Sequence, residues 1–213
     1  GATVSNLLGL VAGRQWCGQQ IGVDVDADGA GALPGFEVFA ASPHASMIKD
    51  LSITGIGRNN FTKVATKPGT EETDVSDLKN RLAASTSKAK LVIASAGTVN
   101  ATDFDNLVAI ADLCAAFGAW LHVDAAFGMF AALDDRRAHL LSGLDRADSI
   151  TSDGHKWLNV PYDCGIFLTR HINVLETSCR AFAPYLQTEA VGNMYINRGV
   201  ENSRRFRALP LWM

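Results

Sequence analysis

The sequence predicts an α/β protein whose main sheet is mostly parallel and covered by helices on both faces. Segments typical of strands alternate with segments typical of helices, and the strand segments are nearly continuous apolar runs. Of the 213 residues, 47% are hydrophobic and 19% charged, which is close to the globular average and excludes a disordered chain. A chain of this length has room for one large domain or two small ones.

The first elements are expected on both sides of a loop. Residues 4–15 carry apolar side chains at helical spacing and predict a helix. A glycine-rich stretch, 24–35, is typical of a surface loop. The short apolar run 36–41 then predicts a strand, and Pro43 can open a helix over 44–51.

The remaining elements continue the alternation. Residues 61–66 alternate between apolar and polar side chains, as strands do. Residues 73–86 predict a polar helix, with Thr73 or Asp74 as the N-cap. Residues 104–118 predict an apolar helix that ends on a glycine. Further strands are expected over 90–97, 120–126, 147–153 and 164–170.

Polar residues follow several of these apolar runs, where ligands gather in parallel sheets. Thr98, Asp124 and the stretch 153–156 lie at such ends. Asp124 can cap the next turn, or it can hold a cationic nitrogen. Lys156 stands between a histidine and a tryptophan, and a lysine in such surroundings suits Schiff-base chemistry.

The segment 1–6 adds a third part of a possible site. It is small and hydroxyl-bearing, and it opens an apolar helix whose free N–H groups can bind phosphate. A phosphate site, a carboxylate for a pyridinium nitrogen and an activated lysine are together what pyridoxal phosphate requires. The alternative is a metal-dependent hydrolase with ligands from His122-x-Asp124 and Asp153-x-His155. That alternative leaves Lys156 unexplained, so we expect no metal and interpret His122 as a structural residue.

Charge and cysteine usage exclude other classes. The net charge of −3, without large blocks of like charge, does not support nucleic-acid binding. No apolar run reaches eighteen residues, so we expect no membrane span. The start of the chain does not resemble a secretory signal. The four cysteines are widely spaced and predict reduced thiols in a cytoplasmic protein, three of them buried.

Two motifs, HVDAAFG at 122–128 and DSITSDGHKWLNVPYDCG at 148–165, carry a family resemblance. With them, the chain resembles the group II pyridoxal-phosphate-dependent amino-acid decarboxylases of fold type I, which include aromatic-L-amino-acid and glutamate decarboxylases. The resemblance covers essentially all of 1–213. It implies part of the cofactor-binding large domain, without the N-terminal segment and the C-terminal small domain of the family.

The resemblance also implies a role for individual residues. Lys156 matches the lysine that binds the cofactor as an aldimine, and Asp124 matches the aspartate that pairs with its pyridine nitrogen. His44 matches the histidine that stacks on the ring. Tyr195 falls where the family carries a tyrosine on a mobile loop that includes Gly192 and Asn193 here and reaches the partner's active site. Ala2, Thr3 and His155 match phosphate-binding positions, and Thr98, Asn100 and Ala126 lie around the ring.

The implied activity is decarboxylation of an L-amino acid to an amine and CO₂ in a homodimer. Tyr195 and His44 argue for an amine product. Other chemistry of the fold remains an alternative, namely oxidative deamination, transamination or a lyase reaction, and so does a catalytically incomplete fragment. The aromatic branch often has Asn-Pro before His-Lys, whereas Asp153-Gly154 stands here, which weakens an assignment to aromatic substrates.

Overall fold

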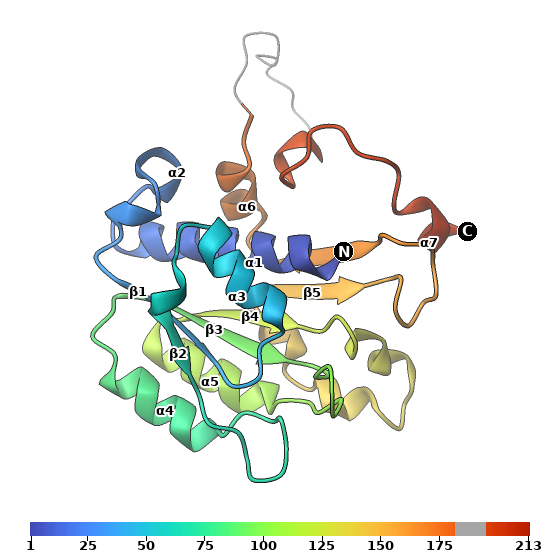
Figure 1. The fold of residues 1–213 in the computed structure, drawn as a ribbon, viewed down its shortest axis with the longest axis horizontal. Helices are drawn as coiled ribbons and strands as arrows, with labels where there is room; N and C mark the ends of the chain where they lie inside the picture. The colour runs from blue at the N-terminus through green and yellow to red at the C-terminus, as the bar shows by residue number, and fades with distance from the viewer. Residues whose placement is uncertain (182–194) are drawn as a thin grey trace.

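The computed structural model describes residues 1–181 and 195–213 and shows one six-stranded sheet, in the order β2-β1-β3-β4-β5-β6 (Figure 1). The fold class predicted from the sequence is confirmed. The strands are β1 Phe36–Ala40, β2 Phe61–Lys63, β3 Ala89–Ser95, β4 Trp120–Asp124, β5 Ser149–Asp153 and β6 Gly165–Thr169. The helices are α1 Ala2–Gln20, α2 Val25–Asp28, α3 Ala45–Ile53, α4 Val75–Ala84, α5 Leu107–Phe117, α6 Ile172–Ser178 and α7 Leu209–Trp212.

The first five strands are parallel, and β6 is antiparallel to β5. Only residues 154–164 connect β5 to β6, and they contain no helix. A parallel partner would require a crossover of a dozen or more residues, so the shorter connection returns the chain antiparallel. The carboxyl ends of β1, β3, β4 and β5 therefore share one edge of the sheet.

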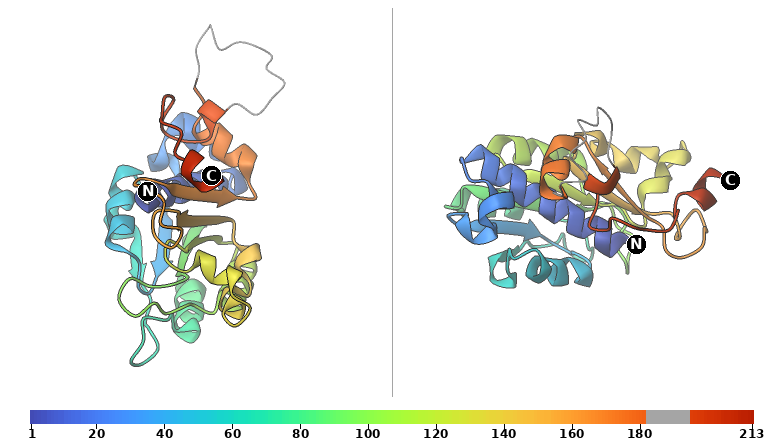
Figure 2. Two further views of the ribbon diagram at one scale, coloured as in Figure 1. Left: turned by 90° about the vertical axis from the view of Figure 1, so that its right-hand side faces the viewer. Right: turned by 90° about the horizontal axis from the view of Figure 1, so that it is seen from above.

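Helices cover the two faces of the sheet and bury a separate apolar core on each. On one face α1 and α3 pack over Trp120, which is completely buried. On the other face α4 and α5 pack over Leu121 and its neighbours. Figures 1 and 2 show α1 running along the sheet opposite α5. Each strand is thus shielded from water on both sides, which explains the continuous apolar runs of the sequence.

Local signals in the sequence set most element boundaries. Asp74 caps α4, because its side chain accepts hydrogen bonds from the N–H groups of Ser76 and Asp77. Helix α5 ends at Gly118, as predicted. The glycine-rich stretch 24–35 is more ordered than predicted and contains α2. Within the described residues, no helix has the length and apolar character needed to cross a bilayer.

Glycines allow α1 to approach the sheet closely. A Cβ atom on Gly9 would lie 2.4 Å from the imidazole of His122, and one on Gly13 would lie 3.0 Å from the indole of Trp120. Glycine weakens a helix interior by about 1 kcal/mol relative to alanine. The close approach brings the first turns of α1, including Asn6, against the carboxyl ends of β4 and β5.

Candidate active site

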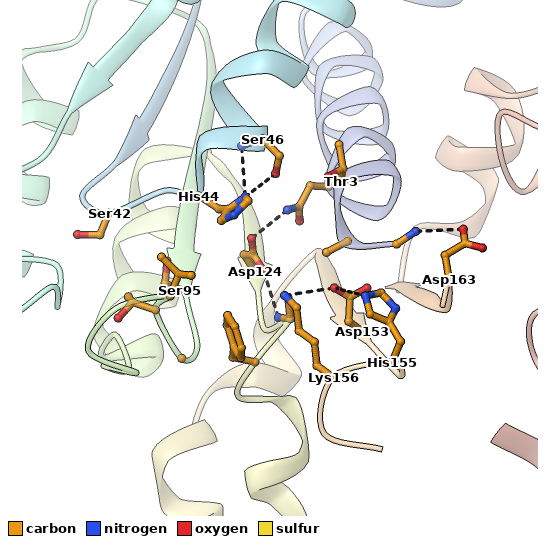
Figure 3. A pocket seen from close by; sticks show the side chains of 18 of the residues that line it. Thr3, Ser42, His44, Ser46, Ser95, Asp124, Asp153, His155, Lys156 and Asp163 are labelled. Carbon is orange, nitrogen blue, oxygen red and sulfur yellow. Dashed lines mark hydrogen bonds and ion pairs between the residues drawn. The ribbon is translucent and has the colours of Figure 1, made fainter. Parts of the chain in front are cut away.

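A cavity of about 320 Å³ opens at the carboxyl ends of the parallel strands (Figure 3). The start of α1 and the loops after β1, β3, β4 and β5 form its walls. This is the edge where ligands bind in open α/β sheets. The cavity is lined by Gly1, Ala2, Thr3, Asn6, Ser42, His44, Ser46, Ser95, Gly97, Thr98, Val99, Asp124, Ala126, Phe127, Asp153, His155, Lys156, Tyr162 and Asp163.

Lys156 presents a primary amine to this cavity. Its Nζ atom lies 3.2 Å from Oδ2 of Asp153 and 4.2 Å from the centre of the Phe127 ring. The Lys156 side chain is 26% exposed, whereas that of Asp153 is 3% exposed. The short turn between β5 and Lys156 therefore holds the amine between a buried carboxylate and an aromatic face.

Asp124 ends β4 and presents a carboxylate to the same cavity. Its Oδ1 atom accepts a hydrogen bond from the N–H of Ala126 at 3.1 Å. Its Oδ2 atom accepts one from Nδ2 of Asn6 at 2.9 Å. Each carboxylate oxygen has lone pairs beyond these bonds, and so can accept a further donor.

His44 lines the cavity from the N-cap of α3. Its Nδ1 atom accepts a hydrogen bond from the N–H of Ser46 at 3.2 Å and lies 2.9 Å from the Ser46 hydroxyl. These contacts hold the ring by one nitrogen, although the side chain is exposed. Figure 3 shows Asp124 between His44 and Lys156.

The first turn of α1 forms the remaining wall. Ala2 and Thr3 begin this 19-residue helix, and no side chain at its N-cap takes up the free N–H groups. Such a helix end attracts an anion. His155 lies beside it, with Nδ1 accepting a hydrogen bond from the N–H of Cys164 at 3.0 Å and its ring centre 4.2 Å from that of Tyr162.

Two of the predicted site residues do not line the cavity. Asn100 donates from Nδ2 to Glu71 at 2.8 Å, because the loop after Thr98 turns its side chain away. Tyr195 lies in a 3₁₀ turn, 72% exposed, with its ring 5.5 Å from the guanidinium of Arg198. Gly192 and Asn193 of the proposed loop lie outside the described residues.

The structure also adds residues that the sequence did not suggest. Phe127 and Ser95 line the cavity, as does Asp163, which pairs with the guanidinium groups of Arg205 and Arg207. These pairs hold the pKa of the Asp163 carboxyl well below its usual range. Phe127 could have been predicted from the sequence as a lining residue, since it follows Asp124 by three residues. Asp163 could not, because its partners lie more than forty positions away.

Comparison with known proteins agrees with this geometry. The chain is 33% identical over 220 residues to an aromatic-L-amino-acid decarboxylase of Bacillus atrophaeus. It is 31% identical over 236 residues to an L-2,4-diaminobutyrate decarboxylase of Acinetobacter baumannii. Both alignments cover 100% of this chain but only 44% and 45% of the relatives, so the chain spans less than half of their length.

A solved structure gives the same result for the fold. The crystal structure of Oryza sativa TDC with PLP and tryptamine superposes with a TM-score of 0.88 at 30% identity, over 100% of this chain and 44% of that one. The family model for the pyridoxal-dependent decarboxylase conserved domain matches residues 1–213. The chain therefore belongs to the pyridoxal-dependent decarboxylase family.

Proposed function

We propose that the cavity binds pyridoxal 5'-phosphate and that the whole enzyme decarboxylates an L-amino acid to the amine and CO₂. One observation carries the proposal: the amine of Lys156 and the carboxylate of Asp124 face one cavity whose wall is the start of α1. Family membership supports the same reaction. Lys156, Asp124 and the α1 N-terminus come from distant segments, and each supplies a different requirement of the cofactor.

The donor set fits this cofactor. Lys156 would hold its aldehyde carbon through Nζ, and the free N–H groups at Ala2 and Thr3 would bind its phosphate together with His155. Asp124 would accept a hydrogen bond from the protonated ring nitrogen, since a nearby anion favours the protonated form. When bound, pyridoxal phosphate supplies an electron sink for the charge left at Cα as CO₂ departs.

Other lining residues would position the ring. We propose that His44 stacks on one face of the ring, held by its contacts to Ser46. Ala126 would lie at the other face, and Thr98 would lie beside the ring. Asn100 is left out of this set, since Glu71 binds its amide.

The proposal extends to the assembly. We propose that residues 1–213 form part of the cofactor-binding domain of a longer enzyme, because the chain spans less than half of its relatives. We further propose that this enzyme is a homodimer, as the family resemblance implies. Tyr195 would act at the active site of the partner subunit. Four free cysteines support a cytoplasmic location, three of them buried as predicted.

The metal alternative has little support. Both ring nitrogens of His122 are hydrogen-bonded to protein groups, Nδ1 to Ser149 and Nε2 to Asn6, and the side chain is completely buried. Within residues 1–181 and 195–213, no three histidine, cysteine or carboxylate side chains form a cluster that could hold an ion. His122 is therefore excluded as a ligand.

The test uses the full-length gene product, loaded with pyridoxal phosphate and supplied with a panel of L-amino acids. We expect equal amounts of CO₂ and amine from at least one of them, without ammonia or peroxide. Lys156→Ala should abolish the reaction. Lys63→Ala, at an exposed position on β2, is the matched control and should keep it. Ammonia and peroxide as products, no CO₂ from any amino acid, or turnover that survives Lys156→Ala would each contradict the proposal.

A further inference from the structure

Behind Asp124 lies a chain of buried side-chain hydrogen bonds that crosses three elements. The indole N–H of Trp120 donates to Oγ of Ser149 at 3.0 Å, and Oγ lies 2.8 Å from Nδ1 of His122. Nε2 of His122 lies 3.0 Å from Oδ1 of Asn6. Asn6 then donates from Nδ2 to Asp124 at 2.9 Å. The first four side chains are at most 1% exposed.

Chemistry fixes the direction of every hydrogen bond in this chain. A carboxylate can only accept, so Asn6 donates from Nδ2 to Asp124 and turns its amide oxygen toward Nε2 of His122. An amide oxygen can only accept, so Nε2 carries the proton of the neutral imidazole and Nδ1 accepts from the Ser149 hydroxyl. The Ser149 oxygen keeps a lone pair for the indole N–H of Trp120, which can only donate.

The opposite orientation of the amide is unfavourable. A flipped Asn6 would set its NH₂ against the Nε2 proton of His122 and its oxygen against the Asp124 carboxylate. A donor would then face a donor and an acceptor would face an acceptor. In this buried region neither group could turn to water instead, and a buried polar group without a partner is costly. The sheet register supports the arrangement, because His122 and Ser149 are directly paired on β4 and β5.

The chain also remains uncharged. Burial lowers the pKa of His122 to about 4, although the nearby Asp124 carboxylate opposes this shift. Asn6 and the Ala126 N–H are neutral donors as well. In the part of the chain that the structure describes, Asp124 is thus held by neutral groups, which orient its carboxylate without cancelling its charge.

We propose that Asn6, His122, Ser149 and Trp120 are positioning residues that lock the Asp124 carboxylate in one orientation, so that its full negative charge faces the cavity. This inference rests on the proposed function, because a cationic ring nitrogen is the group that needs such a carboxylate. A rotating carboxylate, or one beside a protonated histidine, would stabilise that nitrogen less. His122, interpreted from sequence as merely structural, thereby acquires a role in orienting Asp124.

The first test needs neither cofactor nor activity. In full-length, cofactor-free protein labelled with ¹⁵N-histidine, the His122 signals are assigned by their loss in His122→Gln. We expect the Nε2–H form, unchanged between pH 8 and pH 5. A proton on Nδ1, or titration with a midpoint between pH 5 and pH 8, would overturn the inference whatever the enzyme's reaction.

The second test is a double-mutant cycle in the loaded enzyme. Asn6→Ala should lower kcat about tenfold, the effect of losing one hydrogen bond to a charged group, while KM changes little. In an Asp124→Asn background, Asn6→Ala should lower kcat less than twofold, because the charge that Asn6 orients is gone. Asn173→Ala, an exposed asparagine on α6, should leave kcat unchanged. An undiminished kcat in Asn6→Ala, or fully additive losses, would contradict a positioning role.

Ser149→Ala extends the cycle one bond further from Asp124. Without the hydroxyl, Nδ1 of His122 loses its donor, while the amide oxygen of Asn6 still accepts from Nε2. We expect His122 to remain in the Nε2–H form by ¹⁵N NMR and kcat to fall less than in Asn6→Ala. A parental kcat in Ser149→Ala, or a loss as large as that in Asn6→Ala, would refute the part assigned to Ser149.

Discussion

Oδ2 of Asp105 accepts a hydrogen bond from the backbone N–H of Ser95 at 2.7 Å, so a carboxylate ten positions along the chain holds the last residue of β3. Its Oδ1 atom accepts another from the N–H of Thr73 at 2.6 Å. Asp105 is buried, and Ser95 lines the cavity. One side chain thus fastens the loop before α4 to the strand end at the cavity wall.

We expect Asp105→Asn to destabilise the fold by about 2 kcal/mol, because an amide offers one acceptor oxygen to two backbone donors and leaves one of them unpaired. Urea unfolding of the full-length protein measures the loss. Asp112→Asn is the matched control, since that carboxylate is 65% exposed and forms only a surface pair with Arg146. Equal stability of the two variants would contradict the fastening role.

His122 gives a pH dependence of stability. Its folded pKa is lowered to about 4 by burial, whereas the unfolded value is about 6.5. Between these pH values His122 is protonated in the unfolded chain but neutral in the folded chain. The free energy of unfolding therefore falls as the pH falls. The loss is about 3 kcal/mol at pH 4 relative to pH 7.

Unfolding free energies measured across this range should fall less steeply in His122→Gln. His139→Gln, at an exposed position, should keep the parental slope. Parallel slopes for all three proteins would show that His122 titrates normally.

Asp124→Asn should keep the fold and bind the cofactor but lose a hundredfold or more in kcat, because a neutral amide cannot stabilise a cationic ring nitrogen. Cofactor content and turnover are measured on the same preparation. Asp135→Asn, on an exposed turn, serves as control. Turnover near the parental value in fully loaded Asp124→Asn would remove the role proposed for this carboxylate.

With dissolved O₂ as oxidant and water as co-reactant, Tyr195→Phe should slow amine formation and divert the substrate to aldehyde, CO₂, ammonia and hydrogen peroxide, while cofactor binding is retained. We propose that the phenolic hydroxyl of Tyr195 donates the proton that Cα receives after CO₂ departs, and phenylalanine has no such proton. Product analysis of the full-length enzyme decides the matter. Parental amine formation without aldehyde would mean that the proton comes from another group.

Much of the fold followed from patterns within single segments. Strands β3, β4 and β5 were predictable because both faces of the sheet are covered, so their apolar runs are nearly continuous. Asp124 and Lys156, which line the cavity, were predictable as candidate site residues because each is a charged side chain near the end of such a run. The antiparallel direction of β6 was less apparent, since it depends on the length of one connection.

The hydrogen-bonded side chains behind Asp124 could not be predicted from the sequence. Asn6 and Asp124 are separated by 118 positions and meet only because α1 docks against β4. One signal was present, since residues two apart in a strand share a face, which places His122 beside Asp124. Asn100 illustrates the converse. Its neighbour Thr98 lines the cavity, but the local turn gives the Asn100 amide to Glu71.

The identity of the lysine that binds the cofactor tests the account most directly. Borohydride reduction of the loaded full-length enzyme fixes the cofactor to its lysine, and peptide mapping then locates the label. The position of Lys156 between Asp153 and Phe127 predicts a single labelled peptide that carries the cofactor on Lys156. A label on Lys49 or Lys63 instead, both exposed and outside the cavity lining, would contradict the proposed site.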